Sequence, residues 1–362
     1  ARAAMVSFFE KFPELASNDF FITGESYAGV YIPTMAREIV DKAPHINLMG
    51  LAVGDPCTDN VAQRDTMDPI WYAHKNGLVD DATFDMLWNT CHIRDSPFFM
   101  MKSKFRSTEE RVSTTTVDKI DKRTPECKLA WRKFMMSSSH GLSQEWPDLF
   151  VDDYSLFAPV TDAEDVAMTD YLNRADVRKA LHVTDTPVDV WPYPGGGFDY
   201  TKEYDACNEA PVKHAPSMIK FYNYLAPKLK AIWVYNGDTD PCVTYEGTRT
   251  AIKRVGYPEV EGGSYRPWFY NHTAASMEVI MEKAPLFGPD LLAVATGAQF
   301  GGEVVNYEHN LAFVTVHGSG HMVPQFRPQA ALHMLSKLLK FRPLSPLLPS
   351  NETLTDVQEN DF

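Results

Sequence analysis

Gly24-Glu25-Ser26-Tyr27-Ala28-Gly29 lies between a short apolar run and a helical pattern. The run at 18–23 predicts a strand, and the pattern at 30–40 predicts a helix. Ser26 therefore falls on a sharp turn between strand and helix, with its hydroxyl directed out of the sheet. The amides at the start of the helix would face negative charge developing beside that hydroxyl. This context predicts a nucleophilic serine, and its alternative is an ordinary helix cap.

The turn is similar to the nucleophile elbow of α/β-hydrolases, whose pattern is Gly-x-Ser-x-Gly. Ala28 stands where that pattern has its second glycine. Small side chains at Gly24 and Ala28 are still what a tight turn requires. We therefore expect the α/β-hydrolase class, with a central, mostly parallel sheet flanked by helices and a helical cap insertion.

An elbow of this kind predicts an acid after a later strand and a histidine after the last one. The strand-like run AIWVY leads into a loop with Asp238 and Asp240, and the run LAFVTV leads into a loop with His321. Open α/β sheets carry their chemistry at the carboxyl ends of strands, so these groups should meet. Ser26 would attack a carbonyl, His321 would take its proton, and one of the two aspartates would orient the imidazole.

A metal site is the alternative reading of the histidine loop. His317 and His321 are four residues apart, a spacing that binds zinc on a helix. The intervening Gly-Ser-Gly disfavours a helix, and no glutamate follows His317 to act as a base. We therefore expect no metal and no cofactor.

These motifs together resemble the serine carboxypeptidases. The resemblance rests on residues 24–33, 235–240 and 320–324, and it extends through 51–55 and 171–181. It covers most of the chain. The activity it implies is release of single C-terminal amino acids, through an acyl-enzyme, from peptides with a free C-terminus.

The resemblance also implies roles for individual residues. Asp240, rather than Asp238, would be the triad acid, and the N–H of Tyr27 would contribute to the oxyanion hole. Glu25 would hydrogen-bond the terminal carboxylate of the substrate. Met322 would lie beside the pocket for the leaving residue, and Cys242 would be a thiol lining the acyl-side pocket.

Glu25 connects the resemblance to pH. Two family glutamates, of which Glu25 would be one, share a proton and accept a substrate carboxylate at low pH. This implies action in acidic compartments. An acyltransferase branch of the same family, in which an alcohol replaces water, usually carries Asp at this position, so Glu25 favours the peptidase. A non-catalytic binding or stabilising protein is the alternative of another class.

The first residues, 1–9, read as the middle of a helix and lack an initiator methionine. No stretch matches the family's Trp-x-Asn-Gly-Gly-Pro-Gly-Cys motif, which contributes the first strands and the other oxyanion donor. We therefore expect a chain without its N-terminal strands, processed or truncated. Loss of an oxyanion donor costs about a hundred- to a thousand-fold in turnover, so this chain alone is expected to be inert.

The five cysteines contain no Cys-x-x-Cys metal pattern. A bridge between Cys91 and Cys127 would close a loop inside the insertion. By resemblance, Cys207 would bridge to the absent Gly-Pro-Gly-Cys motif. The state of Cys57 is left open, and five reduced core residues are the alternative.

Composition excludes some classes of partner. The 362 residues are 44% apolar, which is normal for a globular protein. The formal charge of −14 argues against a nucleic-acid partner. The sequence contains no run of about twenty apolar residues, so it predicts no membrane span. Sequons at Asn271 and Asn351 suit a protein of the secretory pathway, in a lysosome or vacuole or secreted. A homodimer is left open.

The expected organisation is one hydrolase domain with an insertion. Residues 1–56 and 160–342 would form the core, 57–159 the cap insertion and 343–362 a loose tail. Further elements are expected as a strand at 46–53 and helices at 82–90, 128–136, 169–181, 215–225 and 328–341.

Overall fold

The structure is a computed structural model. It describes residues 1–63, 65–91, 124–138, 162–186, 190–191, 217–272, 276–284, 288–294 and 297–349, and everything below concerns those residues. The predicted positions Cys207 and Asn351 lie outside them.

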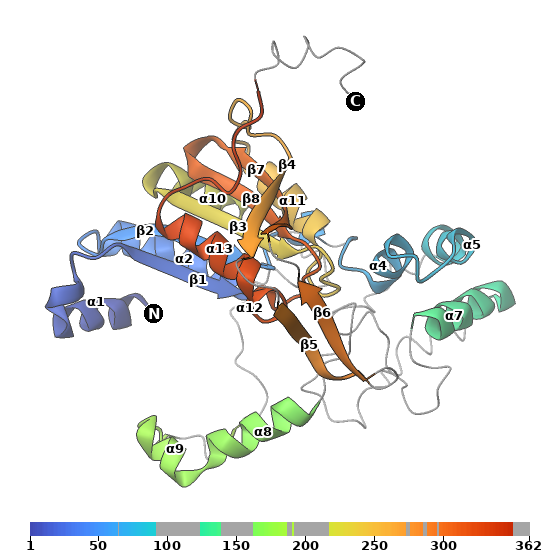
Figure 1. Cartoon of the computed structure of the whole chain (residues 1–362), viewed down its shortest axis with the longest axis horizontal. Coiled ribbons are helices and arrows are strands. Elements are labelled where there is room, and N and C mark those ends of the chain that lie inside the picture. Colours follow the sequence, from blue (N-terminus) through green and yellow to red (C-terminus); the bar gives the residue numbers. More distant parts are fainter. Residues whose placement is uncertain are drawn as a thin grey trace.

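A six-stranded sheet forms the centre of the molecule (Figure 1), in the order β1-β2-β3-β8-β7-β4. The strands β1, β2, β3 and β8 are parallel neighbours, whereas β7 and β4 are antiparallel. Two further strands, β5 and β6, pair with each other in a separate antiparallel ribbon. The bounds are β1 Phe20–Glu25, β2 Leu48–Gly54, β3 Ala231–Gly237, β4 Arg266–His272, β5 Ser276–Ala284, β6 Gly288–Val294, β7 Gly297–Tyr307 and β8 Leu311–Val316.

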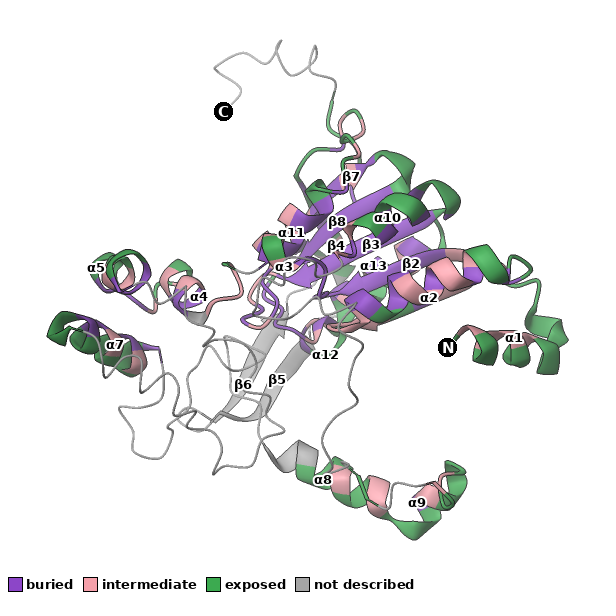
Figure 2. Cartoon of the chain, turned by 180° about the vertical axis from the view of Figure 1, so that it is seen from behind, coloured by how far each residue is buried: buried purple, intermediate pink, exposed green. Residues whose placement is uncertain are grey.

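Burial explains why the parallel strands read as continuous apolar runs. Every residue of β3 and β8 is buried, as expected for central parallel strands covered on both faces. Figure 2 shows this buried centre and the exposed outer faces of the helices. The expected strands at 46–53, 231–235 and 311–316 correspond to β2, β3 and β8.

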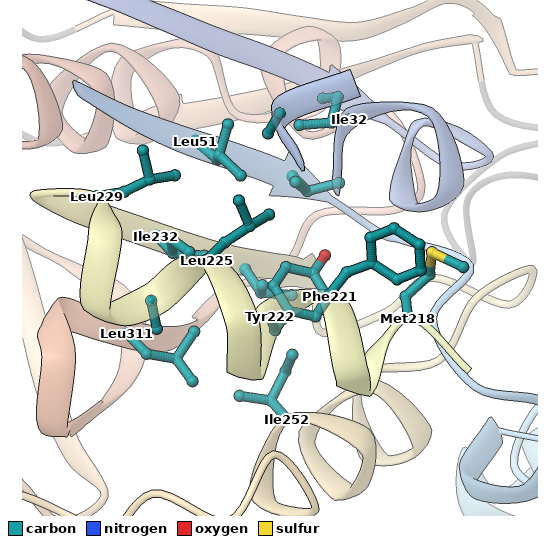
Figure 3. Close-up of a cluster of buried hydrophobic side chains, with 14 of the residues drawn as sticks. Ile32, Leu51, Met218, Phe221, Tyr222, Leu225, Leu229, Ile232, Ile252 and Leu311 are labelled. Atoms are coloured by element: carbon teal, nitrogen blue, oxygen red, sulfur yellow. The ribbon is translucent and has the colours of Figure 1, made fainter. Parts of the chain in front are cut away.

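Two apolar clusters cover the two faces of the sheet. On one face, α2 (Ala28–Lys42) and α10 (Ile219–Leu225) pack on alternate residues of β2 and β3, and Figure 3 shows this cluster. On the other face, α13 (Pro328–Leu339) packs on Trp233 and Trp268. The alternation is visible along β2, where Leu51 belongs to the first cluster and Ala52 to the second.

The remaining helical elements are short or peripheral. Their bounds are α1 Arg2–Lys11, η1 Pro13–Leu15, α3 Asn60–Gln63, η6 Ala226–Lys228, α11 Tyr245–Lys253, η7 Glu308–Asn310 and α12 Val323–Phe326. Among the described segments, no helix has the length and apolar character needed to cross a bilayer.

A third apolar cluster lies within the insertion. It joins α4 (Pro69–Lys75), α5 (Asp81–Asp85), the π-helical η2 (Met86–Thr90) and α7 (Pro125–Ser137). The predicted Cys91–Cys127 disulfide is confirmed, and it ties the end of η2 to α7. Cys57 is also in a disulfide.

The helix predicted at 169–181 is interrupted. It is formed as α8 (Asp162–Asn173) and α9 (Ala175–Ala180), with extended backbone at Arg174 between them. The side chain of Asn173 accepts a hydrogen bond from the N–H of Trp191 and donates to the carbonyl of Trp191. Such side-chain bonding to backbone competes with helix continuation. Both helices lie apart from the central sheet (Figure 1).

The expectation of a loose C-terminal tail is wrong for its first residues. Leu344 and Ser345 are buried, and the guanidinium of Arg266 donates to the carbonyls of Ser345 and Pro346. The N–H of Leu348 donates to the carbonyl of Gly262. A buried arginine with carbonyl acceptors therefore fixes the tail against β4, which the proline-rich composition did not reveal.

Candidate active site

Ser26 lies directly after β1 in a left-handed backbone conformation, with φ of 62°. Its N–H donates to the carbonyl of Gly54 at 2.8 Å, and its carbonyl accepts from the N–H of Gly29 at 2.9 Å. A Cβ at Gly24 would lie 2.8 Å from the Cβ of Ala28, so the turn does require small residues at both positions. Positive φ at a residue with a side chain is strained and is common at functional sites.

The amide of Tyr27 lies at the N-terminus of α2. Tyr27 is the residue that caps this 15-residue helix, and no side-chain hydrogen bond caps it. Ser26 is therefore not an ordinary capping serine. A helix N-terminus supplies N–H donors and a positive dipole end, which is the environment that an oxyanion needs.

His321 and Asp240 form a buried hydrogen-bonded pair. The imidazole Nδ1 lies 2.7 Å from Asp240 Oδ2, and the two residues are 4% and 2% exposed. The carboxylate also accepts from the backbone N–H groups of Cys242 at 2.7 Å and Val243 at 3.1 Å. These amides fix the carboxylate, so it can hold the imidazole in one tautomer.

The acid loop and the histidine loop are bonded to each other. The backbone N–H and the hydroxyl of Thr239 both donate to the carbonyl of Ser319, at 3.0 and 2.8 Å. A Cβ at Gly237 would lie 2.2 Å from the carbonyl oxygen of Gly320. Glycine at 237 therefore permits the close approach that places the two loops side by side.

The two loops and the elbow share one edge of the sheet. Ser26 follows β1, Asp240 follows β3 and His321 follows β8, at the carboxyl ends of parallel strands. Glu25, the residue before Ser26, interacts electrostatically with both His321 and Asp240. The elbow therefore lies within electrostatic range of the acid–histidine pair.

Two pKa shifts describe the electrostatics. Burial raises the pKa of Glu25 above its ordinary value, the charge on His321 opposes this shift, and Asp240 adds to it. For His321, burial lowers the pKa, but the charge and hydrogen bond of Asp240, together with the charge of Glu25, raise it more. The net pKa of His321 is therefore above its ordinary value, because the imidazolium is stabilised by two carboxylates.

Asp238 and His317 form a separate pair. His317 Nδ1 lies 2.7 Å from Asp238 Oδ2, and the imidazole side chain is 55% exposed. Asp238 also accepts from the N–H of Gly318 at 2.7 Å. Each aspartate of the loop thus faces a different histidine, and it is Asp240 that faces His321.

One group of ligand-type side chains could be considered for a metal ion. Asp55, Asp240 and His321 are all buried, and their ligand atoms lie within 4.8 Å of one another. However, Asp240 Oδ2 already bonds the imidazole and Oδ1 already accepts a backbone N–H. The donor set matches an acid–imidazole pair better than a metal site.

The other predicted residues surround this edge. Cys242 is half-buried, is not in a disulfide, and lies two residues after Asp240. Met322 is half-buried and directly follows His321 at the start of α12. Asn271 is exposed on β4, so it is accessible for glycosylation.

Two residues of this region were not singled out from the sequence. Asp55, directly after β2, is fully buried beside Asp240. Tyr72 of α4 donates its hydroxyl to the carbonyl of Thr239 at 2.7 Å, which ties the insertion to the acid loop. Asp55 could have been noticed as an acid at a strand end, whereas no local pattern marks Tyr72.

The mixed sheet, its flanking helices and the strand–turn–helix at Ser26 define an α/β-hydrolase. The sequence matches the serine carboxypeptidase family over residues 1–340. The chain therefore belongs to the serine carboxypeptidase family.

Relatives agree with this assignment. Serine carboxypeptidase-like 33 of Arabidopsis thaliana is 28% identical, with 92% of this chain and 63% of that protein covered. Serine carboxypeptidase 1 of Hordeum vulgare is 25% identical, with 92% of this chain and 66% of that protein covered. This chain thus spans a little under two thirds of the length of the first of these relatives.

A solved structure supports the fold. The crystal structure of Kex1Δp, a prohormone-processing carboxypeptidase from Saccharomyces cerevisiae, superposes with a TM-score of 0.56 at 18% identity. The match covers 92% of this chain and 65% of that structure. At this identity the similarity concerns the fold alone.

Proposed function

We propose that the protein is a serine-type carboxypeptidase that releases single C-terminal amino acids from peptides. The proposal is carried by the buried Asp240–His321 hydrogen bond of 2.7 Å at the sheet edge where Ser26 is held at positive φ. Family membership supports it. The substrate would be a peptide with a free C-terminus, since Glu25 lies beside Ser26 at this edge.

In the proposed reaction, Ser26 Oγ attacks the last peptide carbonyl while His321 Nε2 accepts the serine proton. Asp240 accepts a hydrogen bond from Nδ1–H and stabilises the imidazolium. The N–H of Tyr27 stabilises the oxyanion. The proton then passes to the leaving amine, and water, activated by the same imidazole, hydrolyses the acyl-enzyme.

The protonated form of Glu25 would recognise the terminal carboxylate of the substrate. Its raised pKa keeps a proton on the carboxyl over part of the acidic range, and this O–H can donate to the substrate carboxylate. Peptidase action is therefore expected to be favoured at acidic pH. The Cys91–Cys127 disulfide supports an oxidising compartment, and we propose a lysosome, a vacuole or secretion.

A fluorophosphonate probe tests the proposal. In the protein as its gene encodes it, Ser26 should be labelled covalently, and Ser26→Ala should remove the label. Blocked dipeptides should then release their last residue at a pH between about 4 and 7. The matched control is Asp238→Asn, which removes a histidine partner outside the proposed triad and should leave labelling intact.

Each other result has a defined meaning. Labelling together with acyl transfer from choline or glucose esters, and no release of C-terminal residues, would assign the acyltransferase reaction. A folded protein whose Ser26 never reacts would contradict both reactions and leave a binding role.

A further inference from the structure

Asp55 is a buried carboxyl group for which the proposed reaction has no role. It follows β2, the strand between β1 and β3, its φ is 43°, and it is 0% exposed. Its Oδ1 accepts from the N–H of Gly237 at 2.8 Å and from Nδ2 of Asn236 at 3.2 Å. Among the residues that the structure describes, none donates a hydrogen bond to Oδ2.

The neighbour of Asp55 is the carboxylate that holds His321. The ligand atoms of Asp55, Asp240 and His321 lie within 4.8 Å of one another, and both carboxyl groups are buried. Carboxylates only accept hydrogen bonds. A direct hydrogen bond between the two carboxyl groups would therefore require a proton on one of them.

The hydrogen-bond partners of the two groups indicate which of them would carry that proton. Asp240 already accepts from two backbone N–H groups and the imidazole, all of which favour its ionised form. Asp55 accepts on Oδ1 alone, and in the described part of the chain no Lys or Arg forms an ion pair with it. Two ionised carboxylates buried at this distance would also repel each other strongly.

The charged and titratable groups that face Asp55 also favour its protonated form. Burial raises the pKa of Asp55 well above its ordinary value, the charge of Asp240 adds to this, and the amide of Gly237 opposes it. Glu25, at the end of β1, raises it further. Tyr235 of β3 is neutral as well, because burial raises its pKa above the ordinary value.

We propose that Asp55 is a positioning residue: a neutral carboxylic acid whose Oδ2–H donates to the Asp240 carboxylate and fixes the orientation of Asp240 toward His321. The inference rests on the proposed function for its catalytic consequence. The proton also limits the two carboxyl groups to a single negative charge. His321 therefore faces one buried anion at this position rather than two.

Infrared spectroscopy of the full-length protein tests the proton directly. At neutral pH the wild type should show the carbonyl band of a protonated carboxylic acid, and isotope-labelled aspartate should shift that band, which separates it from Glu25. Asp55→Asn should remove it, and the control Asp238→Asn should retain it. If Asp55→Asn fails to fold, the absence of an isotope-sensitive acid band in the wild type would still overturn the inference.

Two kinetic variants test the positioning role. The amide of Asp55→Asn can still donate to Asp240, so kcat should stay within about threefold of the wild type. Asp55→Leu removes the donor, and kcat should fall by up to about a hundredfold with KM little changed. Because the folded state holds a proton that the unfolded chain releases, stability should decline as pH rises through the pKa of Asp55. This decline should be absent in Asp55→Asn.

Several results would overturn the inference. One is an absence of any isotope-sensitive acid band, and another is unaltered kcat in a folded Asp55→Leu. A third is a tightly bound cation in the purified wild type that is lost in Asp55→Asn, because a cation would then replace the proton. Failure of the triad looks different: Ser26 would not react with the probe, while the acid band would remain.

Discussion

At the scale of single residues, the site depends on backbone conformations that residues other than glycine rarely adopt. Ser26 and Asp55 both have positive φ, 62° and 43°, at the ends of neighbouring strands. A residue with a Cβ in this region costs of order 1–3 kcal/mol. The surrounding hydrogen bonds, from Ser26 N–H to Gly54 and from Cys57 N–H to Ser26, hold the turn against that cost.

Glycine at position 26 should therefore stabilise the fold. We expect Ser26→Gly to raise the free energy of unfolding by up to about 1 kcal/mol, since relief of strain exceeds the added entropy of the unfolded chain. Ser26→Ala keeps the strain and should show no gain. Urea unfolding measures the free energy of unfolding of the two variants. Equal values for Ser26→Gly and Ser26→Ala would mean that the turn is not strained. Both variants should be unreactive toward the probe.

Substitution of Glu25 should change the pH profile in two ways. Glu25→Gln removes one of the charges that raise the pKa of His321, so the acidic limb of kcat should move to lower pH. In the wild type, KM should rise as pH increases through the pKa of Glu25, because in the proposed reaction the protonated carboxyl donates to the substrate carboxylate. In the variant, KM should be flat over that range. Steady-state kinetics from acidic to neutral pH measures both, and an unmoved acidic limb would contradict the coupling.

At the scale of elements, the acid and histidine loops act as one unit. We expect Gly237→Ala to lower stability by about 2–3 kcal/mol and to abolish activity, because its Cβ would meet the carbonyl oxygens of Gly320 and Ser319 at 2.2 and 2.3 Å. The control is Gly256→Ala, where nothing lies within 4 Å although φ is +92°. It should cost about 1 kcal/mol and leave kcat unchanged.

The elements differ in how much of them the sequence could predict. β1, β2, β3 and β8 are apolar runs bounded by turn residues, so local pattern suffices for them. The strands from 266 to 307 were not expected, because half-exposed antiparallel strands such as β7 carry a weaker pattern than buried ones. The sequence places Asp55 at the end of a strand. It does not show that Asp240 lies next to Asp55, because β3, which leads to Asp240, is distant in sequence and pairs with β2 only in the folded chain.

At the scale of the whole molecule, the insertion has its own apolar cluster and its own disulfide. Cys91 and Cys127 are separated by 36 residues, and closing a loop of that size contributes about 4 kcal/mol in the chain-entropy account. Replacing both cysteines by alanine should expose the backbone amides of α4, α5, η2 and α7 to hydrogen exchange. Amides of the central sheet are the internal control and should keep their protection. Equal loss in both regions would show that the insertion and the sheet unfold together.

The interleaving of distant strands has a consequence for biosynthesis. β2 ends at Gly54 and pairs with β3, which begins at Ala231, while β8 closes the other side of β3 from Leu311 onward. β1 and β2 pair with each other, but during translation they emerge long before β3, the other neighbour of β2, and contacts of such large sequence separation form slowly. The nascent chain therefore presents an unpaired edge of β2 until β3 has been synthesised, and we expect it to depend on chaperones in that interval.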